Sequence, residues 1–241
     1  MITRSLMWIA EQIKGRLSGE DCTVSAVSTD TRTLTQGAVY LALKGENFDG
    51  HQFVEAAEKA GAVAVIASQP VTTALPVIYV EDTKLALGQL GAAVKAEVKP
   101  KTIGITGSSG KTTVKEMCAA ILSRRGNVLA TAGNFNNEIG LPLTLLRLTP
   151  EHEYAVVEMG ANHLGEIAYT TDLVQPNVAL VNNVAAAHLE GFGSMDGVKQ
   201  AKGEIFQGLK SGDTAIINLD SHGGDFWESV LDDKQVLSFS V

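Results

Sequence analysis

Three kinds of feature are scarce or missing in this sequence of 241 residues. It has two cysteines, Cys22 and Cys118, too few for a disulfide framework and without the spacing of metal ligands. No apolar run is long enough to cross a bilayer. Its 19 Lys and Arg are outnumbered by 27 Asp and Glu, and the net charge of −8 argues against a broad nucleic-acid surface. We therefore expect a protein of the reducing cytoplasm that neither spans a membrane nor binds nucleic acid.

Hydrophobic residues are plentiful enough for a large core, at 45% of the sequence against 19% charged residues. A chain of this length can fold as one large domain or as two modest ones. We expect two, residues 1–81 and residues 82–241, with the boundary near Asp82. The sequence contains no internal repeat and no low-complexity tract.

Strands and helices are predicted to alternate in residues 1–81, which indicates a small α/β unit. Near its start, Trp8, Ile9, Ile13 and Leu17 have the spacing of one helical face. The other elements expected in this part are strands at 22–28, 38–43, 62–67 and 77–80 and a helix at 51–60.

The second part alternates in the same way. A helix from Thr83 to Val98 follows the acidic pair Glu81-Asp82, and Pro100 ends it. The order that follows predicts an α/β fold with a mostly parallel sheet, helices on both faces and ligands at the carboxyl ends of the strands. The predicted strands are 102–106, 127–131, 154–158, 178–182 and 214–217, and the predicted helices are 111–125, near 142–147, 165–173 and 197–209.

A glycine-rich turn joins the first of these strands to its helix, in KTIGITGSSGKTTVKE from Lys101 to Glu116. Its glycines let the amides of residues 108–111 curl around an anion, and the helix N-terminus adds a positive dipole end. The Lys111 ammonium can reach the outer phosphates of a nucleotide, and the Thr112 hydroxyl can bind Mg²⁺. The stretch therefore predicts a phosphate-binding loop.

This loop departs by one place from the strict spacing G-x-x-x-x-G-K-[ST]. That spacing requires glycine at position 105, which is Ile105, while Gly104 lies one place early. The alternative is a lysine after an ordinary glycine turn. The strand, the loop glycines, the Gly-Lys-Thr-Thr run and the following helix together favour nucleotide phosphate binding.

Polar residues follow two other predicted strands at the edge where ligands are expected. Glu158 ends one strand and is either a second Mg²⁺ ligand or a surface acid; its pairing with the loop favours Mg²⁺. Asn182-Asn183 end another, and His188 follows them. A lone histidine is more often structural than a ligand, so the residues alone leave the role of His188 open.

Three further places allow a structural and a functional interpretation. The polar loop Gly133 to Pro142 could bind phosphate or substrate through its asparagines, or be a turn that they stabilise. Residues 29–32 and 44–45 fit ordinary turn chemistry and solvated charge. Lys202 lies on a predicted helix, where the default is a solvated lysine paired with an acid.

Taken together, ITGSSGKTTVKE, GNFNNEIGLPLTLL, VVEMGANHLGEI, NNVAAAHLEGFGS and AKGEIF resemble the Mur ligases of bacterial cell-wall synthesis. The N-terminal STDTRTLTQGAVYLALKGENFDGHQF is similar to the UDP-binding domain of the same family, so the resemblance spans nearly the whole chain. Within the family, the chain most resembles members that join D-alanyl-D-alanine to UDP-N-acetylmuramoyl-tripeptide.

The resemblance implies an ATP-dependent reaction through an acyl phosphate. It implies that Lys111 steadies the transferring phosphoryl group, that Thr112 and Glu158 hold one Mg²⁺, and that His188 serves a second. Lys202 resembles a lysine that family members carbamylate to support a metal site. The residues implied in ATP binding are Gly107, Ser108, Ser109, Gly110, Lys111, Thr112 and Thr113.

For the uridine substrate, the resemblance implies Ser28, Thr29 and Arg32, and it places Asn136 and Asn137 toward substrate or phosphate. Family members carry a third, C-terminal domain, so we expect this chain to be a fragment with little ligase activity alone. We also expect it to be a monomer. The rival hypotheses are a Mur ligase that adds a single amino acid, a kinase or nucleotide-binding module with the same loop, and an inactive scaffold.

Overall fold

The structure is a computed structural model in which residues 1–186, 189–221, 223 and 225–240 are described. It divides into two compact units. The N-terminal unit comprises residues 1–97 with 146–149, and the central unit comprises residues 98–145 with 150–241. The division falls at the end of helix α3 (Thr83–Val98), later than the boundary expected near Asp82. One contact that links α3 to the N-terminal unit is an ion pair of 2.5 Å between Arg4 Nη2 and Glu97 Oε1.

The N-terminal unit contains a five-stranded sheet in the order β2-β7-β6-β5-β4, and only the β2–β7 pair is antiparallel. A separate antiparallel pair joins β1 to β3. The strands are β1 (Arg4–Ser5), β2 (Arg16–Ser18), β3 (Thr23–Val24), β4 (Val27–Ser28), β5 (Val39–Leu41), β6 (Ala64–Ala67) and β7 (Val77–Tyr79), and the helices before α3 are α1 (Leu6–Gln12), the 3₁₀ turn η1 (Gly50–Phe53) and α2 (Val54–Lys59).

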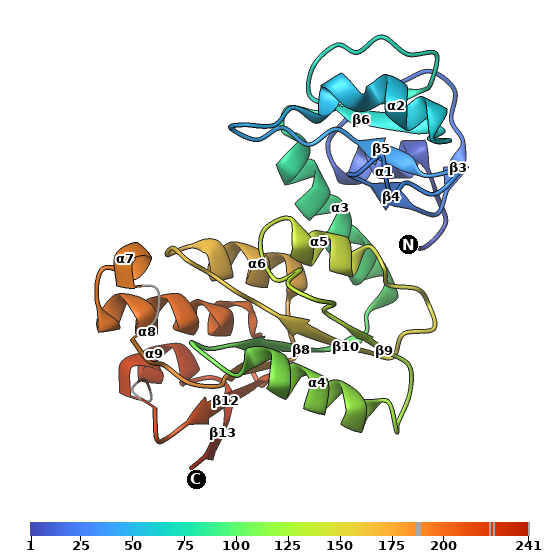
Figure 1. Ribbon diagram of the computed structural model, residues 1–241. Coiled ribbons are helices and arrows are strands. Elements are labelled where there is room, and N and C mark those ends of the chain that lie inside the picture. Colours follow the sequence, from blue (N-terminus) through green and yellow to red (C-terminus); the bar gives the residue numbers. More distant parts are fainter. Residues whose placement is uncertain (187–188, 222, 224, 241) are drawn as a thin grey trace. The chain divides into compact units, whose positions relative to one another are not determined.

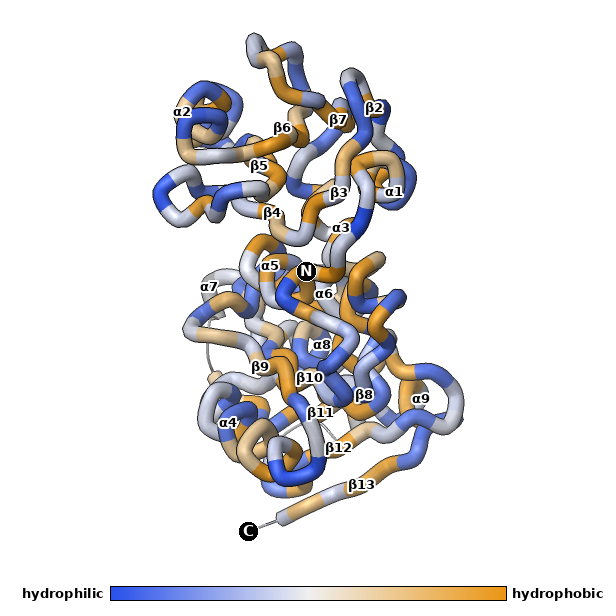
Figure 2. The backbone as a smooth tube through the Cα atoms, turned by 90° about the vertical axis from the view of Figure 1, so that its right-hand side faces the viewer, coloured by the Kyte–Doolittle hydropathy of each residue, from blue (hydrophilic) through white to orange (hydrophobic). Residues whose placement is uncertain are grey.

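The hydrophobic pattern explains how this unit packs. Val54 and Ala57 of α2 belong to one buried cluster with Tyr40, Val65 and Ala67 from the sheet. In Figure 2 the tube through β5 and β6 is mostly hydrophobic, whereas α2 shows both colours, as expected for a helix with one buried face.

One expectation for this unit was wrong. Leu17 does not continue the helical face of Trp8, Ile9 and Ile13, because α1 ends at Gln12 and Lys14 takes a positive φ of 52°. The chain turns there, and Leu17 lies in β2 opposite Ile78 of β7.

The central unit contains a six-stranded sheet in the order β13-β12-β11-β8-β10-β9, and every neighbouring pair is parallel. The strands are β8 (Lys101–Thr106), β9 (Val128–Ala130), β10 (Tyr154–Glu158), β11 (Val178–Val181), β12 (Thr214–Asn218) and β13 (Gln235–Phe239). The helices are α4 (Lys111–Leu122), α5 (Gly140–Leu145), α6 (Glu166–Val174), α7 (Leu189–Phe192), α8 (Met195–Gly203) and α9 (Glu228–Leu231), with 3₁₀ turns η2 (Glu204–Gly208) and η3 (Asp225–Trp227).

Helices cover both faces of this sheet, with α4 on one face and α6 and α8 on the other (Figure 1). The α/β fold with a parallel sheet is therefore confirmed, and each strand predicted for this part has a counterpart. Two details differ. The helix expected at 197–209 is α8 followed by the 3₁₀ turn η2, and the edge strand β13 was not predicted.

Side-chain packing on the two faces accounts for the position of Gly104. On the α4 face, Ile105 and Val156 pack with Val114 in a buried cluster. On the other face, a Cβ at Gly104 would lie 3.2 Å from Met159 Cε and 3.3 Å from Ile205 Cδ1. Gly104 thus allows close packing against the strand and does not belong to the glycine-rich turn that follows it.

The strand order decides where a ligand can bind. Strand β8 lies between β10 and β11, and the chain passes to one side of β8 for β9 and β10 and to the other side for β11. The carboxyl ends of β8, β10 and β11 therefore meet at the point where the order reverses, the usual ligand position in such sheets. In the described part of the chain, no helix has the length and apolar character that a membrane crossing needs.

Candidate functional site

The loop between β8 and α4 depends on two glycines. Gly107 has a φ of 150° and Gly110 a φ of 73°, values that side-chain-bearing residues rarely adopt. Space is also limited, because a Cβ at Gly110 would lie 2.8 Å from Asn182 Nδ2. These glycines let the backbone turn sharply from the strand into the first residue of α4.

The first turn of α4 is suited to bind an anion. Its N-cap residue, Gly110, offers no side chain to cap the helix. The first amides of a helix have no acceptor within it, so those of Lys111, Thr112 and Thr113 remain available to a ligand. Lys111 Nζ donates to the carbonyl of Gly107 at 2.8 Å, which holds the ammonium over the same loop. Positive charge and unpaired amides therefore lie together.

Two other loop amides were expected to face an anion but donate to protein oxygens instead. The amide of Ser108 donates to the carbonyl of Asn183 at 3.0 Å, and the amide of Ser109 donates to Asn183 Oδ1 at 2.9 Å. Asn182 Nδ2 donates to the carbonyl of Ser109 at 2.9 Å. The pair of asparagines after β11 thus fixes the loop. The amides of Ser108 and Ser109 donate to Asn183 and are not free for a phosphate in this structure. Sequence analysis located the asparagine pair at a strand end but did not predict its partner.

A carboxylate and a hydroxyl meet beside this loop. Thr112 Oγ1 donates to Glu158 Oε2 at 2.9 Å, and Asn136 Nδ2 donates to Glu158 Oε1 at 2.9 Å. Glu158 is only 2% exposed, so it is not the surface acid of the alternative interpretation. Hard oxygen donors suit Mg²⁺, which usually keeps few protein ligands and completes its shell with phosphate and water. Thr112 and Glu158 fit that ion, and no cluster of three or more His, Cys, Asp or Glu occurs among the described residues.

The two candidate asparagines of the 133–142 loop have different surroundings. Asn136 contacts Glu158 as above, and its carbonyl accepts from the amide of Gly160 at 2.8 Å. Asn137 Oδ1 accepts from the amide of Gly140 at 2.8 Å, at the start of α5. The structure thus brings Asn136 to the acidic group and gives Asn137 a helix-capping contact.

Lys202 is not the solvated lysine expected by default. It is 2% exposed, and its Nζ lies 5.3 Å from the ring centre of Phe192. Burial, followed by the positive charge of Lys111, lowers the pKa of Lys202 to about 8. The Coulombic effect of Lys111 indicates that the two ammonium groups lie in the same region of the central unit. His188, the remaining candidate, lies outside the described residues.

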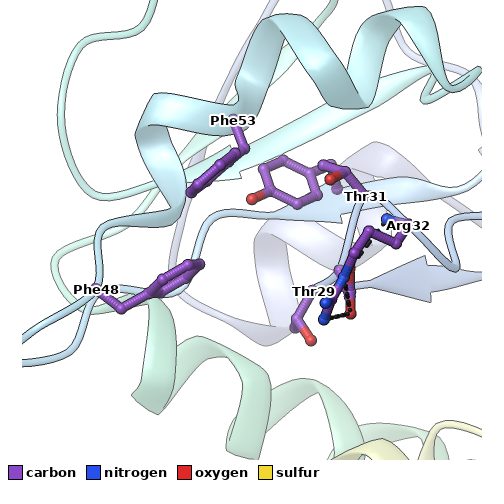
Figure 3. A pocket seen from close by; sticks show the side chains of 7 residues that line it. Thr29, Thr31, Arg32, Phe48 and Phe53 are labelled. Carbon is purple, nitrogen blue, oxygen red and sulfur yellow. Dashed lines mark hydrogen bonds and ion pairs between the residues drawn. The ribbon is translucent and has the colours of Figure 1, made fainter.

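A second candidate site is a pocket of about 510 Å³ within the N-terminal unit. Figure 3 shows Phe48 and Phe53 on one side of it and Thr29, Thr31 and Arg32 on the other. The structure thus places Thr29 and Arg32 in the lining of one pocket. Ser28 does not line the pocket, and its hydroxyl donates to the carbonyl of Asp30 at 2.9 Å.

The polar side of the pocket carries an exposed ion pair. Arg32 Nε and Nη2 donate to the carboxylate of Asp30, with Nη2 2.6 Å from Oδ2. These hydrogen bonds lower the pKa of Asp30 to about 2. The Arg32 side chain is 86% exposed, so it can also reach a bound anion.

The aromatic side of the pocket was missed by sequence reasoning. The rings of Phe48 and Phe53 are stacked, with centroids 5.6 Å apart and an interplanar angle of 12°. Both are well exposed for phenylalanine, at 50% and 41%. The signal was the pair of aromatic residues in NFDGHQF beside a polar turn, a combination that suits a ligand with a flat ring and an acidic group.

Family models match both units of the chain. Residues 105–241 match the Mur ligase middle domain, and residues 23–101 match the model described as Mur ligase family, catalytic domain. The chain belongs to the Mur ligase family. This Mur ligase chain is 54% identical over 240 residues to the UDP-N-acetylmuramoyl-tripeptide–D-alanyl-D-alanine ligase of Escherichia coli strain K12, with 100% of this chain and 53% of that protein covered.

Solved structures similar to this chain belong to the same family. The crystal structure of MurF from Acinetobacter baumannii has a TM-score of 0.93 and 40% identity, covering 97% of this Mur ligase chain and 52% of that one. The MurF ligase of Thermotoga maritima in complex with ADP has a TM-score of 0.82 and 33% identity, covering 90% of this chain and 50% of that one. The chain thus spans about half the length of the relatives that it matches.

Proposed function

We propose that this chain carries the nucleotide site and the uridine-substrate site of an ATP-dependent ligase that joins D-alanyl-D-alanine to UDP-N-acetylmuramoyl-tripeptide. The observation that carries the proposal is the pairing of Thr112 with Glu158 at 2.9 Å beside an uncapped helix N-terminus, in a member of the Mur ligase family. The names of the relatives support the choice of substrates, and the ADP complex of the Thermotoga maritima protein supports the nucleotide.

The proposed reaction has two steps. A carboxylate oxygen of the tripeptide attacks the γ-phosphorus of ATP, ADP leaves, and an acyl phosphate forms. The amine of D-alanyl-D-alanine then attacks the acyl carbon, inorganic phosphate leaves, and the amine loses a proton as the amide forms. The first step transfers a charged group and mainly requires neutralised charge and fixed positions.

The residues of the central unit fit the needs of that first step. The amides of residues 111–113 bind phosphate oxygens, and the Lys111 ammonium neutralises charge on the transferring group. Thr112 and Glu158 hold Mg²⁺, which supplies further positive charge when bound. Ser108 and Ser109 shape the loop through Asn183, so we assign them a supporting part in nucleotide binding.

Lys202 fits the carbamylation implied by the family resemblance. Only a neutral amine can attack CO₂, and a pKa of about 8 leaves far more neutral amine near pH 7 than an ordinary lysine has. We propose that the carbamate of Lys202 and the side chain of His188 support a second Mg²⁺. Protein incubated with ¹³C-bicarbonate should show a carbamate carbon by NMR that is absent from Lys202→Met; the same signal in both proteins would count against the proposal.

In the N-terminal unit, we propose that the pocket binds the uridine diphosphate part of the substrate. Arg32 pairs with the diphosphate, Thr29 supplies a hydroxyl, and the aromatic side formed by Phe48 and Phe53 packs against the uracil ring. Asn136, beside Glu158, is proposed to face the reacting carboxylate or phosphate. The use of ATP is compatible with the cytoplasmic location that the unpaired cysteines favour.

The proposal is tested by binding to this chain. Calorimetric titrations with UDP, UDP-N-acetylmuramate and UDP-N-acetylmuramoyl-tripeptide should all saturate, with the tripeptide form binding most tightly. ADP with MgCl₂ should also saturate. Binding of ADP with MgCl₂ but of none of the uridine compounds would instead support a kinase or nucleotide-binding module.

A further inference from the structure

Lys115 is a buried lysine to which the proposed reaction assigns no role. It lies on α4 beyond the phosphate-binding turn and is 1% exposed. Burying an ammonium is costly unless it is paired, so its partners indicate its role. Lys115 Nζ donates to the carbonyl of Thr131 at 2.7 Å and pairs with Glu116 Oε1 at 2.7 Å. The first of these contacts reaches a different part of the chain, just beyond the end of β9.

Thr131 links Lys115 to Glu158, the acidic residue of the site. It is 2% exposed, and its Oγ1 accepts from the backbone amide of Glu158 at 3.0 Å. Its own amide donates to the carbonyl of Val156 at 3.1 Å. Thr131 therefore contacts the end of β10 at two places, and Lys115 holds the carbonyl of Thr131.

The carboxylate of Glu158 is fixed from the same surroundings. Thr112, which binds one of its oxygens, lies on the same helix as Lys115, and Asn136, which binds the other, lies on the loop that begins near Thr131. The helix, the loop and the strand end thus form one set of hydrogen bonds around a single acidic group. Lys115 connects the helix directly to the backbone at Thr131.

We propose that Lys115 is a positioning residue that sets the distance between the Thr112 hydroxyl and the Glu158 carboxylate, and so prepares this pair for a Mg²⁺-nucleotide. The inference rests on the proposed function, because it assumes that the pair binds Mg²⁺. It assigns Lys115 no contact with nucleotide. Its effect should therefore appear in the metal-dependent part of nucleotide affinity and not in the metal-free part.

The experiment compares ADP binding with MgCl₂ and with EDTA for the parent chain and for Lys115→Met. Methionine keeps the length and packing of the side chain but removes the donor and the charge. We expect the affinity for ADP with MgCl₂ to fall about 10-fold, the size of one lost hydrogen bond from a charged group, while affinity in EDTA changes less than about twofold. Lys210→Met, at an exposed lysine of the same unit, is the matched control and should match the parent in both conditions.

A second variant tests the route through Thr131. Thr131→Val keeps the shape and the backbone carbonyl but removes the oxygen that accepts from Glu158. It should weaken ADP binding with MgCl₂ and spare binding in EDTA, and the double variant should lose less affinity than the product of the two single losses. If Lys115→Met does not fold, as judged by circular dichroism, the ADP affinities of Thr131→Val with MgCl₂ and with EDTA test the inference.

Two results would overturn the inference. One is an unchanged affinity for ADP with MgCl₂ in the variants. The other is an equal loss with and without Mg²⁺, which would mean that Lys115 supports the fold of the loop as a whole. A parent chain that binds no ADP with MgCl₂ would overturn the proposed function itself, which separates the two failures.

Discussion

The nucleotide loop of the central unit and the pocket of the N-terminal unit are built in opposite ways. The loop is held by backbone contacts and by asparagine, lysine and glutamate side chains with defined partners, and Glu158 and Lys202 are each 2% exposed. The pocket is lined by side chains that remain accessible, with Arg32 86% exposed and paired to Asp30. One site is fixed in advance, whereas the other keeps freedom to rearrange.

That difference follows from what each site is proposed to bind. Phosphoryl transfer requires charges placed in advance, because any reorganisation adds to the barrier. A binding pocket only has to retain its ligand, and an exposed arginine can exchange Asp30 for a diphosphate at little cost. We therefore expect substitutions in the loop to have larger effects than substitutions in the pocket.

Lys111→Ala should have the largest effect. Loss of a charged donor at the loop should weaken the binding of ADP with MgCl₂ about 100-fold, measured by calorimetry. Binding of UDP to the N-terminal unit should be unchanged, and Lys210→Ala serves as the control. A loss below threefold would mean that the loop does not bind phosphate through Lys111.

The burial of Lys202 should make the stability of the central unit depend on pH in the alkaline range. Because its pKa is lowered from 10.5 to about 8, the unfolded chain binds more protons than the folded chain between these values, and stability rises with pH there. From pH 7.5 to pH 9.5 the central unit should gain about 2 kcal/mol relative to Lys202→Met.

This gain is measured by guanidinium unfolding of both proteins at the two pH values in CO₂-free buffer. A stability difference between the two proteins that stays constant with pH would show that Lys202 titrates as an ordinary lysine in the folded state.

Asn183→Ala tests whether the loop is fixed by the residues after β11. It removes the acceptor for the amide of Ser109 and the donor to its hydroxyl, both at 2.9 Å. We expect the binding of ADP to weaken about 10-fold, less than for Lys111 because water can replace these exposed contacts. Gln207→Ala, at an exposed amide of the same unit, should leave the affinity for ADP unchanged. Equal ADP affinities of the two variants would show that Asn183 does not contribute to nucleotide binding.

Arg32→Ala should have the smallest effect of the four. An exposed ion pair contributes little, so UDP affinity should fall about fivefold at low salt, and the loss should shrink in 0.5 M NaCl. Lys59→Ala, at an exposed lysine paired with Glu55, is the control. A much larger loss that is insensitive to salt would mean that the pocket is as fixed as the loop, and the contrast between the two sites would fail.

The same contrast explains what the sequence could predict. The loop was recognised because its glycines, Lys111 and Thr112 are neighbours in the chain, and Glu158 because a strand end identified it. The roles of Lys115 and Thr131 were not predicted, since they depend on contacts between residues far apart in sequence. A lysine on an amphipathic helix gives no sign of burial until the packing around it is known.

The pocket shows the opposite limit. Composition alone favoured ordinary turn chemistry for residues 29–32, and the structure does show Asp30 and Ser28 in local turn contacts. Only the resemblance to a family pointed to a binding site there. The aromatic pair in NFDGHQF hints at a binding surface, but the sequence does not show that Phe48 and Phe53 stack and stay exposed, because that follows from how the chain folds around η1. Strand β13 was missed for a related reason, as an edge strand with an exposed surface lacks a buried pattern.

The central claim is that one chain holds two different sites, a fixed one for nucleotide and an adaptable one for the uridine substrate. The most direct measurement is a calorimetric titration of the parent chain with UDP-N-acetylmuramoyl-tripeptide, before and after saturation with ADP and MgCl₂. The account predicts saturable binding of one uridine ligand per chain in both titrations. Loss of uridine binding after saturation with ADP, with release of the bound ADP at high uridine ligand, would show a single shared site and contradict it.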